Sequence, residues 1–146
     1  MKLIQVSVFL ENKPGRLSKP CRILSDAGLN ILALSLADTQ QFGILRLIVQ
    51  DWQKAKTVLE KKGCVVNTVE VVAIEIEDHP GGLEKVLRVI EECSLNVEYM
   101  YPVTLKREGR GVFIFRFENL EEARPALHEK DILPVIPETL FAWLTE

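Results

Sequence analysis

The sequence predicts an α+β protein built from two βαββαβ repeats, and three observations lead to this prediction. Strand-like and helix-like stretches follow one another in the same order twice. In each half, a Pro-Gly pair ends the first strand and opens a helical pattern, at Pro14-Gly15 and at Pro80-Gly81. The second pair lies 66 positions after the first, and a fixed period indicates a duplicated unit. We therefore expect two domains, residues 1–69 and 70–146.

The first half contains the patterns of four strands and two helices. Apolar residues at helical spacing predict a helix that begins at Arg16 and stops at Gly28. Pro20 lies near its start, and a proline beyond the first turn removes a backbone donor, so we expect a distorted start. Asp51 is expected to cap a second helix that ends at Gly63. The predicted strands are residues 3–10, 30–38, 44–50 and 64–72.

The second half repeats the order, with two residues inserted in one turn. Asn119 and Glu122 form a capping box for its last helix, which Pro125 weakens. Residues 65–77 contain no Gly or Pro, so we expect the two halves to join without a linker. The apolar tail, residues 137–146, is expected to cover an exposed surface. The predicted elements are strands at 71–76, 96–105 and 132–135, a strand after the turn at 106–110, and helices at 83–93 and after 119.

The composition is that of an ordinary globular protein, with 47% hydrophobic and 27% charged residues in 146. The net charge of −3 hides an asymmetry. Residues 1–69 contain ten Lys and Arg and five Asp and Glu, a net +5, whereas residues 70–146 contain eight and sixteen, a net −8. Opposite signs favour pairing of unlike halves, and the acidic balance argues against nucleic acid as a partner.

The three cysteines predict reduced, buried thiols, because they are odd in number, widely spaced and flanked by apolar residues. They form no zinc-ligand spacing, so we expect no metal and no cofactor. No signal peptide is evident, and no uncharged apolar run approaches the roughly 18 residues of a membrane span. We expect a cytoplasmic protein that does not bind membranes.

The two Pro-Gly turns are the candidate ligand loops. A turn that leads into a helix gathers unpaired backbone N–H groups at the positive end of the helix dipole, which suits a carboxylate. Gly15 and Gly81 allow a close backbone approach, and the prolines hold the turns rigid. Asn12 and Asp78 stand two residues before the prolines and could bond a ligand's charged groups. A free amino acid, with both charges on one carbon, matches these groups.

Residues 11–17, the helix after them and Gly28-Leu29-Asn30-Ile31 resemble the ACT domain, a regulatory module that binds amino acids. Both repeats look like it. The resemblance implies a ferredoxin-like fold, with antiparallel sheets and helices on one face, and a ligand at the interface of paired ACT domains. The ligand-binding residues that it implies are Asn12, Pro14, Gly15, Arg16, Leu17, Asn30 and Ile31, with their counterparts Asp78, Pro80, Gly81, Gly82, Leu83, Asn96 and Val97. Lys13 and His79 lie in the same two turns, and we add them to the candidate ligand-binding residues.

The second copy departs from the family pattern in two places. Asp78 replaces the asparagine, and its charge would repel a carboxylate and suit an ammonium instead. Ser94 stands where the first repeat has Gly28. We therefore expect two non-equivalent sites, with the first turn the better carboxylate site.

Other candidate side chains carry weaker indications. His79 and His128 have no partner at catalytic or metal spacing, and residues 106–110 indicate a solvated hairpin tip. Residues 99–101, Tyr-Met-Tyr, could line a ligand, although core packing is favoured. The strand at 110–117 faintly resembles that of RNA-recognition modules, but its phenylalanines fall in the wrong phase and should face the core.

Three functions remain, in decreasing order of support. The first is a non-catalytic amino-acid sensor that forms a homodimer or acts on a metabolic enzyme. The second is a regulatory small subunit of a biosynthetic enzyme, because the first turn also looks like that of the acetolactate synthase small subunit. The third is an acylphosphatase-type enzyme on the same fold, for which no catalytic pair is evident. We expect no catalytic residues.

Overall fold

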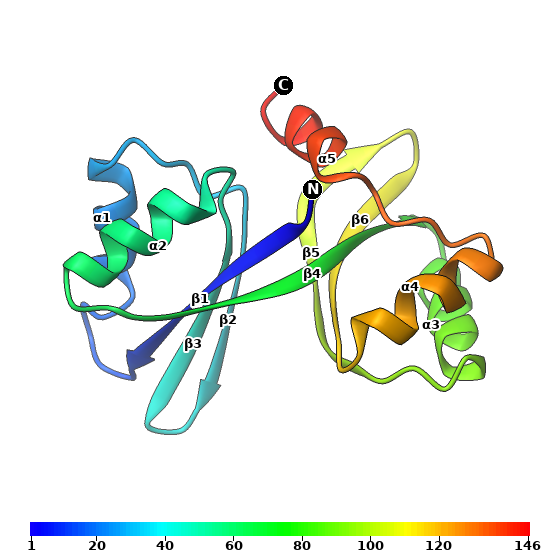
Figure 1. Cartoon of the computed structure of the whole chain (residues 1–146), viewed down its shortest axis with the longest axis horizontal. Helices are drawn as coiled ribbons and strands as arrows, with labels where there is room; N and C mark the ends of the chain where they lie inside the picture. The colour runs from blue at the N-terminus through cyan, green and yellow to red at the C-terminus, as the bar shows by residue number, and fades with distance from the viewer. The chain divides into compact units, whose positions relative to one another are not determined.

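The computed structural model describes residues 1–146, apart from the side chain of Thr39, and divides the chain into two compact units. The first repeat unit is Ile4–Glu70, and the second repeat unit is Val71–Glu146 together with Met1–Leu3. The elements, in chain order, are β1 (Leu3–Glu11), α1 (Ser18–Asp26), β2 (Ala33–Thr39), β3 (Phe42–Ile48), α2 (Trp52–Lys61), β4 (Val65–Glu77), α3 (Gly82–Glu92), β5 (Val97–Arg107), β6 (Arg110–Phe117), α4 (Leu120–Glu129) and α5 (Pro137–Leu144) (Figure 1). Their order confirms the predicted fold class.

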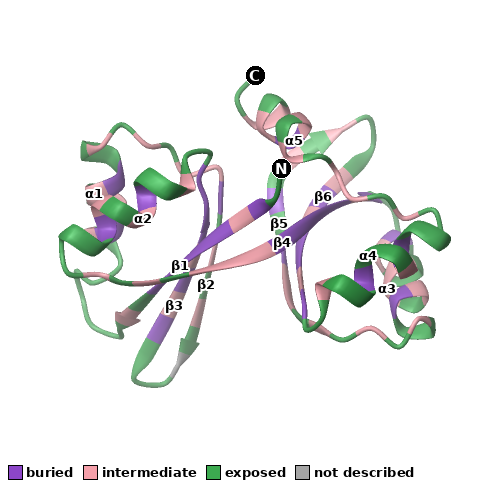
Figure 2. Cartoon of the chain, viewed as in Figure 1, coloured by how far each residue is buried: buried purple, intermediate pink, exposed green. Residues whose placement is uncertain are grey.

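The first repeat unit is an antiparallel sheet covered on one face by two helices. Its strand order is β2-β3-β1-β4, and β3 pairs antiparallel with both β1 and β2. Alternate residues of β1 and β3, such as Val8 and Leu45, turn toward Leu24 of α1 and Leu59 of α2. These side chains are almost completely buried, and Figure 2 shows exposed residues on the outer sides of α1 and α2. The period-two pattern of the strands therefore builds the core.

The second repeat unit has the same layers, with strand order β4-β6-β5 and with α3 and α4 against the sheet. Phe115 and Phe117 are buried in its core, and their rings stack at a centroid distance of 5.9 Å. Phe113 is partly buried against the same cluster. The prediction that these phenylalanines form core is confirmed.

The helix ends follow the local signals in the sequence. Asp51 Oδ1 accepts a hydrogen bond of 3.1 Å from the Lys54 backbone N–H, and Asn119 Oδ1 accepts one of 3.2 Å from that of Glu122. Gly28 and Gly63 take the left-handed backbone, with φ of +73° and +84°, directly after the caps of α1 and α2. The Asp51 cap and the two glycine stops are confirmed. The capping box is confirmed for its Asn119 half, because the Glu122 side chain makes no return bond to Asn119 N–H among the described residues.

Three predicted elements are corrected. α1 begins at Ser18 and not at Arg16, and β2 begins at Ala33 and not at residue 30. The predicted strand at 132–135 reduces to one bridge, in which Val135 N–H donates to the Ala73 carbonyl at 2.7 Å. Pro134 explains this, because a proline inside the segment has no N–H for a strand ladder.

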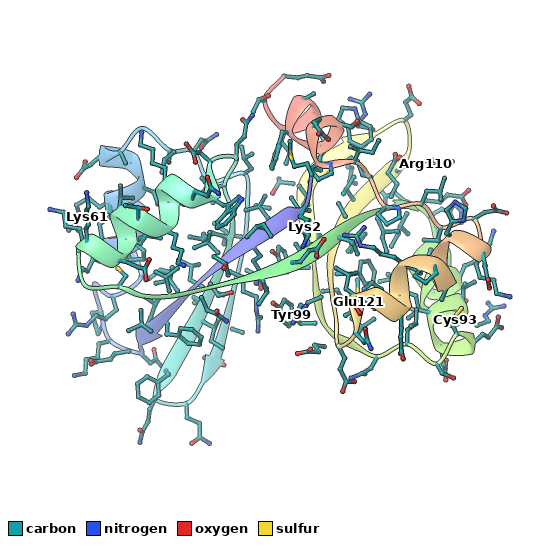
Figure 3. The ribbon with its side chains drawn as sticks, in the orientation of Figure 1. Lys2, Lys61, Cys93, Tyr99, Arg110 and Glu121 are labelled. Atoms are coloured by element: carbon teal, nitrogen blue, oxygen red, sulfur yellow. The ribbon has the colours of Figure 1, made fainter. Side chains whose placement is uncertain are left out.

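The cysteines and the tail also differ in detail from expectation. The three cysteines are free thiols, as predicted, but they are only partly buried; Cys93 lies just beyond α3 (Figure 3). The apolar tail forms α5, whose Leu140 is completely buried. Arg107 lies 4.4 Å from the Trp143 ring and 3.5 Å from a Glu146 carboxylate oxygen, so the tail is held to the end of β5. No helix in the described chain is long and apolar enough to span a membrane.

Candidate functional site

The first predicted loop is the turn between β1 and α1. Its left-handed residue is Gly15, with φ of +84°, and the N–H of Arg16 donates to the Lys13 carbonyl at 3.2 Å. Ser18 Oγ donates to the Gly15 carbonyl at 3.1 Å. Residues 11–18 are all exposed, so the whole turn is accessible to a ligand.

In both repeat units, the turn is fixed to the tip of the neighbouring β-hairpin. Asn12 N–H donates to the Gln41 carbonyl at 2.9 Å, and Asp78 N–H donates to the Gly109 carbonyl at 2.9 Å. Asn12 adds a side-chain bond of 3.0 Å from Nδ2 to the Gln40 carbonyl. The Asn12 amide nitrogen therefore anchors the turn.

The two turns differ in length because of Pro20. The C-caps of α1 and α3, Ala27 and Cys93, occupy matching positions, whereas α3 begins two positions earlier than α1. Only the first few N–H groups of a helix need no intrahelical acceptor, so proline can stand no later than the third helical residue without losing a bond. Pro20 is that third residue of α1. Pro20 thus makes Ser18 the earliest start of α1 that loses no backbone hydrogen bond, and this lengthens the first turn.

The longer turn changes the setting of two residues. Arg16 and Leu17 match Gly82 and Leu83 of the second repeat. Leu83 lies within α3 and packs against the core, whereas Leu17 precedes α1 and is 44% exposed. Arg16 is likewise exposed, outside the helix.

Charged side chains surround the first turn. Lys13 Nζ lies 3.0 Å from Glu11 Oε2, and the pKa of Glu11 is lowered by that hydrogen bond, by the charge of Lys13 and by that of Arg16. Glu11 is therefore ionised at neutral pH. The side chains of Arg16 and Lys19 have neither a hydrogen bond nor an ion pair with any residue that the structure describes. Arg16, Lys19 and Glu11 line a cavity of about 290 Å³ next to the turn.

At the second turn, the charges neutralise one another. Lys106 Nζ lies 3.0 Å from Asp78 Oδ2, and His79 Nε2 lies 2.6 Å from Glu77 Oε2. His79 Nδ1 also lies 2.9 Å from the Pro80 carbonyl. Both partners of the ring are acceptors, so both contacts are hydrogen bonds only when the ring is protonated. They raise the pKa of His79, the Pro80 carbonyl most and then Glu77. Glu77, Asp78, His79 and Lys106 line a smaller cavity of about 190 Å³.

The backbone of the second turn is also tightly closed. Gly81 takes a φ of +89°, and Gly82 N–H donates to the His79 carbonyl at 3.0 Å. A Cβ atom on Gly82 would lie 1.9 Å from the Glu77 carbonyl oxygen. Glycine is therefore required at this position, which Arg16 occupies in the first repeat.

The remaining predicted residues lie at the other end of each repeat unit. β1 and β2 are both antiparallel to β3 and so run in the same direction. Asn30 and Ile31 precede β2, so they lie at the end of the sheet away from the turn that follows β1. In the second unit, Asn96 Nδ2 donates to Glu118 Oε2 at 3.0 Å, and both residues line an acidic cavity of about 440 Å³. Within one unit, the turn residues and the residues before the second strand are not brought together.

Several residues that line the first-turn cavity are not among the ligand-binding residues predicted from the sequence. Phe42 at the start of β3 and Val65 at the start of β4 come from distant parts of the chain. Glu11 and Lys19 flank the predicted turn, and their charges are the feature of the sequence that points to them. No group of three His, Cys, Asp or Glu side chains that could hold a metal ion occurs among the described residues.

The two units thus define a tandem α+β protein in which one Pro-Gly turn joins the first strand to the first helix of each unit. Residues 1–142 match the family model of the ACT domain pair, and the chain belongs to this family. The match confirms the resemblance seen in the sequence.

Among solved structures, the chain is similar to protein BT0572 from Bacteroides thetaiotaomicron, with 34% identity over 97% of this chain and 96% of that one and a TM-score of 0.87. It is also similar in fold to the ligand-free regulatory subunit of aspartate kinase from Thermus thermophilus, with 18% identity, coverage of 88% and 93%, and a TM-score of 0.63.

A curated relative is the acetolactate synthase small subunit of Buchnera aphidicola subsp. Baizongia pistaciae (strain Bp). The two are 31% identical over 83 aligned positions, and the match covers 54% of this chain and 52% of that protein. The match thus spans about half the length of the curated relative.

Proposed function

We propose that this ACT domain pair is a non-catalytic regulatory protein that binds a free amino acid at a strand-to-helix turn. The observation that carries the proposal is the charge arrangement at the first turn. Two cations, Arg16 and Lys19, have no partner among the described residues, and the ionised Glu11 lines the same cavity. Charges of both signs beside an open turn match the carboxylate and the ammonium that every free amino acid carries.

The regulatory part of the proposal is supported by the relatives. Two of the proteins that this chain resembles are described as an enzyme's regulatory or small subunit. A regulatory role requires that the ligand bind one conformation or assembly better than another.

A thermal-shift panel with the twenty amino acids at millimolar concentration tests the binding. A ligand that binds only the folded chain stabilises it by about 2.7 kcal/mol at a hundredfold excess over Kd, so we expect a rise in Tm with at least one amino acid. The matching α-hydroxy acids, which lack the ammonium, are the control and should give a smaller rise. No shift with any amino acid would refute the proposed function.

The family resemblance also implies a ligand at an interface between ACT domains, and we include a homodimer in the proposal. Light scattering with and without the stabilising amino acid tests this part. We expect a dimer whose stability against dilution changes with the ligand. A monomer at all concentrations, with and without ligand, would remove the homodimer from the proposal.

A second candidate is a small subunit that regulates a biosynthetic enzyme, favoured by the identity shared with the acetolactate synthase small subunit. It predicts that the chain co-purifies with a large catalytic subunit when both are expressed together. It also predicts that the large subunit responds to an amino acid only when this chain is present. A chain that stays separate and leaves the activity unchanged would exclude this candidate.

A further inference from the structure

The first-turn cavity combines charges with an apolar wall. Its volume of about 290 Å³ lies just below the range of about 300–1,000 Å³ typical of ligand pockets, which suits a small molecule. Phe9, Phe42 and Val65 line it, and these side chains are 43%, 53% and 66% exposed. A ligand that covers large exposed apolar side chains removes their surface from water, and this contributes favourably to its binding free energy.

The charged groups of the cavity match a zwitterion. The Arg16 guanidinium can donate two parallel N–H hydrogen bonds to the two oxygens of one carboxylate. Lys19 adds a second positive charge to the same cavity. Glu11 uses one oxygen for Lys13 at 3.0 Å, and a carboxylate accepts further bonds, so it can also bind an ammonium.

The apolar wall favours one class of amino acid. A second carboxylate or a second ammonium on the ligand would lose water against Phe9, Phe42 and Val65 without gaining a partner there. A cationic side chain would in addition be repelled by Arg16 and Lys19. A bulky apolar side chain fits the wall without either cost.

The second repeat offers a contrast. Each charged side chain that lines its cavity is already in an ion pair, Lys106 with Asp78 and His79 with Glu77. A ligand carboxylate would have to break one of these pairs. Arg16 and Lys19 at the first turn are therefore available to bind a ligand carboxylate. Lys106 and His79 at the second turn are already paired with Asp78 and Glu77.

We propose that the first-turn cavity selects an amino acid with a bulky apolar side chain and that the second-turn cavity does not bind it. The carboxylate contacts Arg16 and Lys19, the ammonium contacts Glu11, and the side chain packs on Phe9, Phe42 and Val65. This inference rests on the proposed function and adds the ligand class and the repeat that binds it.

Calorimetric titration of the full chain tests the ligand class, with leucine, phenylalanine, alanine, glutamate and lysine as probes. We expect leucine or phenylalanine to bind at least tenfold more tightly than the other three. Equal affinities, or tighter binding of alanine, glutamate or lysine, would overturn the inference and leave the proposed function standing. Failure of every amino acid to bind would refute both.

Matched variants test the location. Arg16→Ala is expected to weaken the binding of leucine at least tenfold, whereas Arg22→Ala, which removes an exposed cation of α1 outside the cavity, leaves it unchanged. Phe42→Ala should reduce the preference for leucine over alanine. Lys106→Ala, at the second turn, should leave the affinity for leucine unchanged. Normal leucine binding by Arg16→Ala, or its loss in Lys106→Ala, would place the ligand elsewhere and overturn the inference.

Cys64 gives an independent readout, because it lines the same cavity and is a free, partly buried thiol. In a Cys21→Ser, Cys93→Ser background, saturating leucine should slow the alkylation of Cys64 by iodoacetamide at least fivefold. The same concentration of lysine should not. Unchanged alkylation in the presence of bound leucine would contradict the placement of the ligand.

Discussion

The two strand-to-helix turns share a backbone plan and differ in their charges. Both are tied to a hairpin tip by one backbone hydrogen bond, and both lead into helices that end at matching positions. The first turn keeps Arg16 and Lys19 unpaired among the described residues, whereas Asp78 and His79 of the second are each in an ion pair. A duplicated unit can therefore keep its fold while only one of its turns stays open to a charged ligand.

The largest expected change in the free energy of unfolding comes from a substitution in the tightly closed second turn. Gly82→Ala places a Cβ atom 1.9 Å from the Glu77 carbonyl oxygen, so the backbone must move. Overpacking of this kind costs about 1–3 kcal/mol, more than the roughly 1 kcal/mol that alanine gains over glycine in a helix. Urea unfolding followed by Trp143 fluorescence, in a Trp52→Phe background, reports on the second repeat unit.

The matched control is Arg16→Ala at the equivalent position of the first turn. Arg16 is exposed and outside α1, so its loss should change the free energy of unfolding by less than about 0.5 kcal/mol. Urea unfolding followed by Trp52 fluorescence, in a Trp143→Phe background, measures this free energy for the first repeat unit. Equal effects of the two substitutions would show that the turns do not differ in tightness.

A smaller effect is expected where α1 and α3 end. Gly28 and Ser94 match in position and both take the left-handed backbone, with φ of +73° and +57°. The left-handed backbone costs a non-glycine residue about 1–2 kcal/mol. Part of the gain from introducing glycine is offset, because glycine loses more conformational freedom on folding. Ser94→Gly should therefore stabilise the second unit by about 0.5–1 kcal/mol in urea unfolding.

The reverse substitution, Gly28→Ser, sharpens the test. Nothing lies within 4 Å of a Cβ atom built on Gly28, so only backbone strain is introduced. A loss of about 0.5–1 kcal/mol in the first unit should mirror the gain in Ser94→Gly. Changes of the same sign in both variants would contradict this account.

The smallest expected effect concerns pH at the second turn. The Pro80 carbonyl and Glu77 raise the pKa of His79 above its ordinary value of 6.5, so its stabilisation is complete below that pH and is lost as pH rises through the raised pKa. The pKa of Glu77 is lowered by its hydrogen bond to His79, so that contribution is present above 4.5 and is lost as pH falls through the lowered pKa. The pair is therefore most stabilising between these values.

An NMR titration of the His79 ring measures this. Glu77→Gln should move the pKa of His79 toward its ordinary value, because the carboxylate is removed and only the Pro80 carbonyl remains. The control Glu84→Gln removes another exposed carboxylate, which pairs with Arg88 of α3 and not with His79. A His79 pKa that is unchanged in Glu77→Gln would contradict the assigned contact.

The parts of the fold that could be predicted from the sequence are those set by local chemistry. Asp51 and Asn119 cap helices through their own side chains, and Gly28 stops α1 because it can take a positive φ. α1 begins two residues after the predicted Arg16, because Pro20 limits how early the helix can begin and does not merely distort its first turn. Proline has no N–H to donate and can stand no later than the third helical residue, so the sequence itself bounds the start of α1 at Ser18 or later.

The candidate site was predictable only in part, because much of it depends on contacts between distant residues. The turn residues around Gly15 were identified from their own sequence, but Phe42 and Val65 reach the cavity through the pairing of strands. Lys106 neutralises Asp78 from the neighbouring hairpin, a pairing that the sequence order does not reveal. The positions of Asn30 and Asn96 at the far ends follow from strand direction.

Pro20 also bears on symmetry. If the protein were a homodimer of single repeats, every substitution would appear at both turns, because a two-fold axis repeats each residue. With the repeats joined in one chain, the position that Pro20 occupies in the first repeat is held by Val86 in the second, and only one helix is shortened. Covalent fusion thus releases the pair from two-fold symmetry, and a single proline can tune one turn while the other stays as it was.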